Sequence, residues 1–183
     1  MADWYNPRKA SQIAAYFAQR EGGKINVLKL VKLIYLADRN FMKAFDSSMI
    51  NDNLVSMDHG PVNSRTLNFI NGLAEDSGWS EFITDRENHF IGLASSEFAD
   101  SDLDELSRAE IGILEKTWSE FGGMTRWQIR DYTHDHCPEW EDPDGSSNPI
   151  PYERVFKALG KSKPSELDER IRTDRWISSV LRD

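Results

Sequence analysis

The chain has 183 residues and a formal net charge of −9 at pH 7, because 31 acidic residues outnumber 22 lysines and arginines. This balance argues against non-specific binding of nucleic acid, since such binders neutralise phosphates with Lys and Arg. The length fits one domain, and the single cysteine excludes an internal disulfide framework. No apolar run reaches the roughly 20 residues of a membrane span, and the N-terminus lacks the pattern of a signal peptide, so we expect a cytoplasmic protein without a membrane partner.

The first part of the chain predicts two helices, of which the second forms the core. Asn6 and Pro7 suit the N-cap and the first position of a helix that ends near two glycines at 22 and 23. From Ile25 to Phe45 the apolar residues form a stripe that is too broad for a helix on the surface. We therefore expect a central core helix. Its predicted polar side consists of Lys29, Lys32, Asp38 and Arg39.

A short strand is predicted over Leu54–Met57, followed by the sequence His59-Gly60-Pro61. Gly60 can adopt a positive φ and Pro61 suits a first helical position, so we expect a rigid corner that leads into a helix from Val62 to Ala74. The corner holds the imidazole of His59 in place. It is either part of a functional site or a structural turn.

The segment from Trp79 to Leu93 changes to a strand-like pattern. Two apolar runs joined by a polar tetrapeptide at 85–88 predict a β-hairpin. Because an isolated hairpin is marginally stable in water, it should pack on helices or pair with Leu54–Met57. We expect a three-stranded antiparallel sheet against a helical body.

The second half of the chain predicts four more helices. Ser107 and Thr125 each begin a capping-box pattern, and two further helices are expected over Tyr152–Leu159 and Ser165–Leu181. The predicted fold class is α+β and mostly helical, with a helical body around a central apolar helix and a small antiparallel β-sheet or hairpin.

Charge is distributed unevenly along the chain. Residues 24–43 contain five basic residues and one acid, whereas residues 97–110 contain six acids and one base. The acidic stretch would attract a basic protein partner, unless both stretches are ordinary solvated faces.

Two of the four histidines and the only cysteine lie within residues 133–140. As a metal site, His134 and Cys137 would share a helix face but would need further ligands. As a Cys–His nucleophile, the segment lacks a glycine-rich oxyanion loop. The favoured interpretation is structural: His134 caps the last turn of a helix, Pro138 stops the helix and Trp140 packs back. The sequence predicts no catalytic residue, no cofactor and no metal.

Three segments in this order resemble the Panacea domain of SocA-like antitoxins. Residues 29–39 (KLVKLIYLADR) are similar to the family's KLxKLlYlad helix, residues 57–62 (MDHGPV) to its xxxGPV corner, and residues 133–140 (THDHCPEW) to its TH…pW segment. The resemblance covers about residues 25–140. It implies an antitoxin domain over 1–163 and a C-terminal amphipathic helix over 164–183.

The resemblance implies an antitoxin, of bacterial or phage type, that neutralises a co-encoded protein toxin by direct binding. An alternative is an adaptor that delivers the toxin to a Clp-type protease, as the founding member is described. A third alternative is a small-pocket enzyme that uses Asp38, His59 and His134. If the His59 ring docks against Asp38 or His134, we expect His59→Ala to impair neutralisation of the partner with little loss of fold. The motif residues that the resemblance carries over are Lys32, Tyr35, Asp38, His59, Gly60, Pro61, Thr133, His134 and Trp140.

Overall fold

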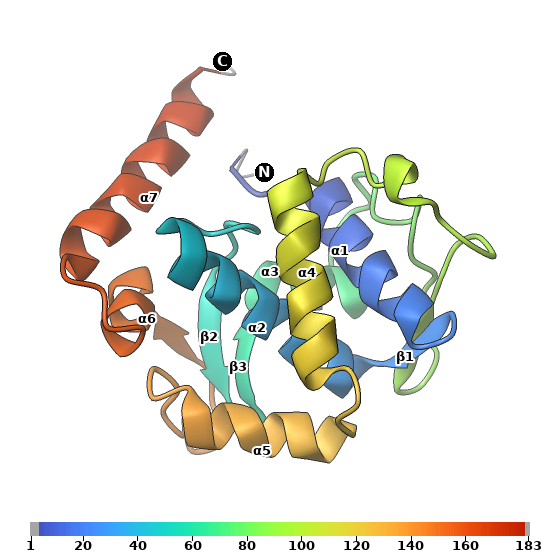
Figure 1. The fold of residues 1–183 in the computed structure, drawn as a ribbon, viewed down its shortest axis with the longest axis horizontal. Helices are drawn as coiled ribbons and strands as arrows, with labels where there is room; N and C mark the ends of the chain where they lie inside the picture. The colour runs from blue at the N-terminus through green and yellow to red at the C-terminus, as the bar shows by residue number, and fades with distance from the viewer. Residues whose placement is uncertain (1–3, 182–183) are drawn as a thin grey trace.

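The computed structural model of the protein describes residues 4–181, which form an α+β fold that is mostly helical (Figure 1). The helices are α1 (Pro7–Arg20), α2 (Val27–Phe45), α3 (Ser64–Ile70), α4 (Arg108–Phe121), α5 (Arg126–His136), α6 (Tyr152–Ala158) and α7 (Pro164–Val180), with a 3-10 helix at Asp100–Asp102. The strands are β1 (Lys24–Asn26), β2 (Leu54–Met57), β3 (Gly60–Asn63), β4 (Phe90–Gly92) and β5 (Asn148–Ile150).

The prediction of a central core helix is confirmed by α2. Its neighbours include α1, α4, α5, α6 and strand β3, and Figure 1 shows it surrounded by them. The helix begins at Val27 because Asn26 accepts hydrogen bonds from the backbone N–H groups of Leu28 and Lys29. Ile25, which we expected in the helix, lies in β1 instead.

The predicted polar side of α2 does not face water, since Lys29, Lys32 and Asp38 are all buried. A helix that is packed on nearly every side leaves no face for water, so each of these groups must find a partner inside the protein. Lys29, for example, pairs with Glu21 at 2.7 Å and donates to the carbonyl of Gly122 at 2.7 Å. Of the five basic residues at 24–43, Lys29 and Lys32 are thus internal, whereas Lys24 and Lys43 are exposed.

The main sheet has the strand order β3-β2-β5, and all pairs are antiparallel. The corner at residues 58–59 is the turn of the β2–β3 hairpin, in which Met57 pairs with Gly60. Pro61 thus lies in a strand and not at the start of a helix. An edge strand such as β3 tolerates proline, because the backbone N–H groups on its free side do not hydrogen-bond to another strand. The helix that follows begins at Ser64 and ends at Ile70, so it is shorter than predicted.

The hairpin predicted over Trp79–Leu93 forms only in part. Bridges join Ile83 to Leu93 and Glu87 to Phe90, but the regular strand in this segment, β4, pairs with β1. Strand β2 has β3 on one side and β5 on the other, so no edge is left for the 79–93 segment. The three-stranded sheet exists, with partners other than those expected.

The helix starts read from the sequence are confirmed at three places. Asn6 caps α1, while Ser107 with Glu110 and Thr125 with Gln128 form capping boxes at α4 and α5. Each box satisfies two N–H groups that would otherwise lack a partner, and such caps depend only on residues that are close in sequence.

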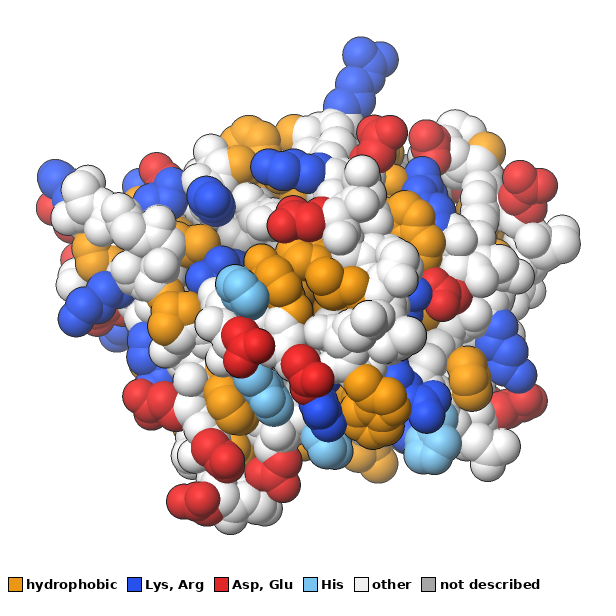
Figure 2. Space-filling model, turned by 60° about the horizontal axis from the view of Figure 1, so that its bottom comes forward, with side chains coloured by type: hydrophobic (Ala, Val, Ile, Leu, Met, Phe, Trp, Pro, Cys, Tyr) orange, Lys and Arg blue, Asp and Glu red, His pale blue; other side chains and the backbone are white. Residues whose placement is uncertain are grey.

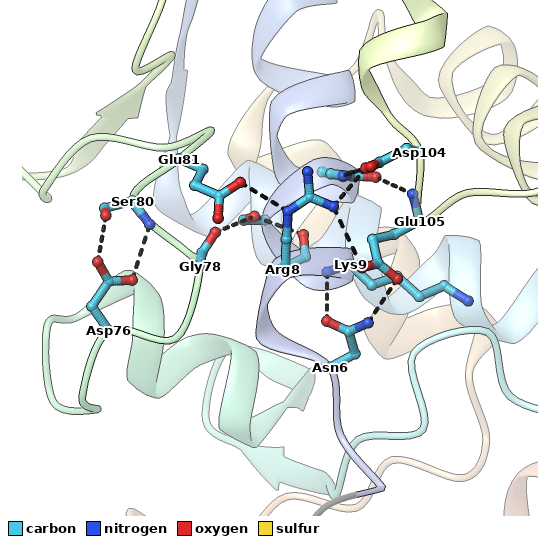
Figure 3. Close-up of polar contacts among 11 residues, drawn as sticks. Asn6, Arg8, Lys9, Asp76, Gly78, Ser80, Glu81, Asp104 and Glu105 are labelled. Atoms are coloured by element: carbon cyan, nitrogen blue, oxygen red, sulfur yellow. Dashed lines mark hydrogen bonds and ion pairs between the residues drawn. The ribbon is translucent and has the colours of Figure 1, made fainter.

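The acidic stretch at 97–110 is partly neutralised within the chain (Figure 3). Arg8 of α1 pairs with Glu81 at 2.8 Å and with Asp104 at 2.5 Å, and Lys9 pairs with Glu110. Much of this negative charge therefore faces α1, which weakens the expectation that the stretch attracts a basic partner.

The helix predicted near the C-terminus is present as α7, and Figure 1 shows its far end directed away from the body. Leu167 and Ile171 are buried, and Arg175 donates to the carbonyl of Asp52 at 2.9 Å. Trp176, Val180 and Leu181, which lie further along the same helical segment, are exposed. Among the helices of residues 4–181, none has the length and apolar character needed to cross a membrane.

Candidate functional site

Four of the motif residues meet where α2, β3 and α5 come together. The Lys32 Nζ donates a hydrogen bond to the carbonyl oxygen of Pro61 at 2.8 Å. A Cβ atom added to Gly60 would lie 2.7 Å from the Thr133 Oγ1 and 3.0 Å from the Lys32 Nζ. The glycine is therefore required by the close approach of three segments, and its φ of +101° is a second reason.

Lys32 is only 1% exposed, and its ammonium group has no carboxylate in hydrogen-bond contact in the part of the chain described here. Burial lowers the pKa of Lys32 to about 7, since an ammonium ion loses its hydration inside a protein. The side chain is thus only partly charged at neutral pH. Its role at this point is to bridge α2 to the strand that contains Pro61.

Gly60→Ala is expected to lower the free energy of unfolding by about 2 kcal/mol, because alanine would be strained at this φ and would also contact Thr133. Thermal unfolding measures the effect. Gly22→Ala is the matched control, since Gly22 has the same φ of +101° and nothing within 4 Å of an added Cβ. Equal losses in the two variants would mean that the contact with Thr133 contributes nothing.

The segment at residues 133–140 is a helix end, as the structural interpretation predicted. The ring of Trp140 stacks on His134 with centroids 4.0 Å apart, and its Nε1 donates to the carbonyl of Met57 at 2.9 Å. One detail is wrong: His136, not His134, is in contact with a last-turn carbonyl, that of Tyr132. The Nε2 of His134 is buried without a hydrogen-bond partner, and burial lowers the pKa of this ring.

The two chemical interpretations of this segment find no support in its geometry. Burial raises the pKa of the Cys137 thiol to about 12, so the thiolate that a nucleophile requires is absent at neutral pH. Within residues 4–181, no three His, Cys, Asp or Glu side chains are grouped to hold a metal ion.

Asp38 is fully buried and connects the end of α2 to the loop before β2. Its carboxylate accepts hydrogen bonds from the Ser48 hydroxyl and from the backbone N–H groups of Met49 and Ile50, at 2.9, 2.8 and 3.3 Å. The amide of Asn63 donates to the other oxygen at 3.3 Å. Burial raises the pKa of Asp38 to about 6, although the hydrogen bonds from Ser48, Met49 and Ile50 offset part of the effect of burial.

Glu139 is an important residue that sequence reasoning missed. This fully buried carboxylate accepts hydrogen bonds from the Tyr35 hydroxyl at 2.7 Å and from the Arg39 guanidinium at 2.6 and 3.2 Å. Burial and the adjacent carboxylate raise the pKa of Tyr35. Its position between Pro138 and Trp140 in the motif was the one available indication, whereas its partners lie about 100 positions away.

His59 is exposed on the hairpin turn, and its ring lies 6.3 Å from that of Trp127. The His59 ring is not docked against Asp38 or His134, because Asp38 is enclosed by its four donors and His134 stacks on Trp140. The three residues therefore have separate surroundings and do not assemble the small-pocket active site considered above.

An open pocket of about 490 Å³ lies beside the point where Lys32, Gly60 and Thr133 come into contact. It is bounded by the start of α2, the β2–β3 turn and the start of α5, and by parts of the loops at 86–89 and 145–146. Figure 2, which brings the α5 end of the molecule forward, shows hydrophobic, basic, acidic and histidine side chains intermingled on this face. Lys32, His59 and Gly60 line the pocket, but Asp38, Thr133, His134 and Trp140 do not.

Most of the motif residues are thus buried or partly buried, and His59 is the motif residue that is exposed at the pocket. Arg86, His89, Arg126 and Trp127 also line the pocket, and nothing in their local sequence indicated it.

Residues 30–141 match the model of a protein family described as antitoxin SocA-like, Panacea domain. The matched range contains the α2 motif from Leu30 onward, the hairpin and the segment that ends at Trp140. No curated protein and no solved structure matches the chain in the corresponding comparisons.

Proposed function

Because the chain belongs to the family of SocA-like antitoxins with a Panacea domain, we propose that it neutralises a co-encoded protein toxin by binding it directly. The observation that carries this proposal is the family match, which spans more than half of the chain and includes the residues that meet at α2, β3 and α5. We assign the antitoxin role to a domain of residues 1–163, with residues 164–183 as an appended helix.

The size of the protein is compatible with stoichiometric inhibition. A standard stable interface covers roughly 800 Å² on each partner. The described chain exposes 9341 Å², so such an interface would occupy only a small part of its surface. Binding of this kind requires no turnover, which agrees with the separate surroundings of Asp38, His59 and His134.

In this proposal the buried motif residues support the fold, and His59, the exposed motif residue, contacts the toxin. Lys32, Asp38 and Thr133 are buried and hydrogen-bonded within the chain. They would therefore act by holding neighbouring surface residues in place and not by direct contact with a partner. His59 is exposed, and it lies beside an exposed tryptophan. Tryptophan is among the residue types that dominate interface energies.

The test is co-expression with the product of the neighbouring gene in a host whose growth that product arrests. We expect growth to be restored and the two proteins to co-purify as a complex of defined stoichiometry. The control replaces this chain with an unrelated protein of similar size and charge. Persistent growth arrest together with the absence of a complex would refute the proposal.

Toxin half-life distinguishes binding from delivery to a protease. An unchanged half-life in cells with and without a Clp-type protease is the result expected for neutralisation by binding. Rapid loss of the toxin that depends on both the chain and the protease would instead identify the adaptor mechanism.

A further inference from the structure

The pocket beside the β2–β3 turn combines an apolar interior with a basic rim. Its walls include apolar side chains from α2, β2, β3 and α3, namely Val27, Leu28, Val31, Met57, Val62 and Leu67. Most of these come from segments that are far apart in the sequence, so the apolar surface exists only in the folded chain. A volume of about 490 Å³ is large enough to receive one or two side chains of a partner.

The rim of this pocket is basic in a protein that is acidic overall. Arg86, His89, Arg126 and His59 line it, and Asp58 is the one carboxylate among the lining residues. The Oδ1 of Asp58 already accepts a hydrogen bond from the backbone N–H of Gly145 at 3.0 Å. The pocket is therefore a local region of positive charge on a chain with a net charge of −9. Such a region favours a partner segment of negative charge.

Two of the rim side chains are held in place before any partner binds. The Arg86 Nε donates to the carbonyl of Asn88 at 2.7 Å, and its Nη1 donates to Asn71. The guanidinium of Arg126 lies 5.1 Å from the centroid of the Trp127 ring. The guanidinium of Arg130 lies 4.8 Å from the same centroid. Groups that are already ordered lose less conformational entropy on binding.

Trp127 adds an aromatic contact at the mouth of the pocket. It is 45% exposed although it is one of the largest side chains in the protein. Exposed Trp and Arg side chains that lie next to a pocket are the residue types most enriched among interface hot spots. The pocket thus offers three complementary features at one place: an apolar cavity, fixed cations and an exposed indole.

We propose that this pocket receives a segment of the toxin in which an acidic residue lies next to a large apolar residue. The apolar side chain enters the cavity between α2 and the β2–β3 hairpin, and the carboxylate pairs with the arginines of the rim. This inference rests on the proposed function, because it names the surface and the chemistry through which neutralisation would occur.

The first test measures the dissociation constant for the product of the neighbouring gene by titration calorimetry. Arg126→Glu and Trp127→Ala are each expected to weaken binding by about 30-fold or more, as hot-spot residues do. Both positions are exposed at the start of α5, where glutamate is favourable for the helix, so the variants should fold. A thermal melt checks this for each protein.

The structure supplies a matched control for each variant. Arg108 is also the exposed first residue of a capping-box helix, but it lies away from this pocket, so Arg108→Glu should change binding by less than about 2-fold. Trp176 is a second exposed tryptophan, at 65%, on α7, and Trp176→Ala should be equally neutral.

The possible results of the binding measurements test the pocket inference and the proposed function separately. If the wild-type chain binds and both pocket variants bind equally well, the pocket inference is wrong while the proposed function stands. Weakening by Trp176→Ala alone would place the toxin on α7 instead. If the wild-type chain neither binds nor neutralises the toxin, the proposed function itself fails.

A second test identifies what enters the pocket. A photoreactive phenylalanine analogue in place of His59, which is exposed on the turn, should cross-link to the toxin in the complex. Mass spectrometry should find the cross-link in a toxin segment that contains Asp or Glu beside a large apolar residue. A cross-linked segment without an acidic residue would overturn the proposed chemistry.

Discussion

Replacing Asp38 with alanine is expected to lower the free energy of unfolding by about 3 kcal/mol. The substitution leaves the backbone N–H groups of Met49 and Ile50 and the side chains of Ser48 and Asn63 without their acceptor. Two of these donors are buried backbone groups, and an unpaired buried donor costs the full penalty of its lost hydration. A cavity in place of the carboxylate adds to the loss.

Urea denaturation followed by circular dichroism measures this change. Asp135→Ala is the control, because Asp135 is exposed on α5 and its loss should change the free energy of unfolding by less than about 0.5 kcal/mol. If Asp38→Ala unfolds like the wild type but abolishes toxin binding, Asp38 contacts the partner and our structural assignment is wrong.

Replacing Lys32 with methionine is expected to change how stability depends on pH between about 7 and 10.5. The pKa of Lys32 is about 7 in the folded chain and 10.5 when the side chain is in water. Between these values the unfolded chain binds more protons than the folded chain. The free energy of unfolding of the wild type therefore rises with pH across this window because of Lys32, by up to about 1.4 kcal/mol per pH unit.

Methionine has a similar shape and does not titrate, so Lys32→Met removes this contribution. The variant should be more stable than the wild type at pH 7, and the difference should shrink by about 3 kcal/mol as the pH rises to 10. The tyrosines, which also titrate near this range, are common to both proteins and cancel in the comparison.

Urea denaturation at several pH values between 7 and 10 checks this prediction. Lys116→Met is a suitable control, since Lys116 is exposed on α4 and should give a profile parallel to that of the wild type. Parallel profiles for the wild type and Lys32→Met would show that Lys32 keeps its proton in the folded chain. The hydrogen bond to Pro61 would then stabilise the ammonium form more than burial destabilises it.

Individual motif residues show which structural features a local sequence pattern can predict. The sequence correctly indicated that Gly60 can adopt a positive φ, since this follows from the backbone preference of glycine. It did not indicate that Pro61 lies in a strand, because strand pairing depends on β2 and β2 in turn pairs with residues 148–150.

The buried polar residues of α2 show the same limit. Their helical spacing from the apolar residues placed Lys32 and Asp38 on a common polar side. Yet a periodic pattern reports only which residues differ from the apolar stripe, and not whether other elements cover them. The elements that cover them, β3 and α5, lie about 30 and 100 positions further along the chain.

The sequence by itself determined the helix starts at Asn6, Ser107 and Thr125, the central position of α2 and the order of the family motifs. These features depend on hydrogen bonds and spacing within one or two helical turns. Only the tertiary structure decided that Lys32, Gly60 and Thr133 meet, that Glu139 binds Arg39, and that Arg126 and Trp127 border a pocket with His59. Contacts between residues that are distant in sequence follow from the packing of whole elements, which local patterns do not specify.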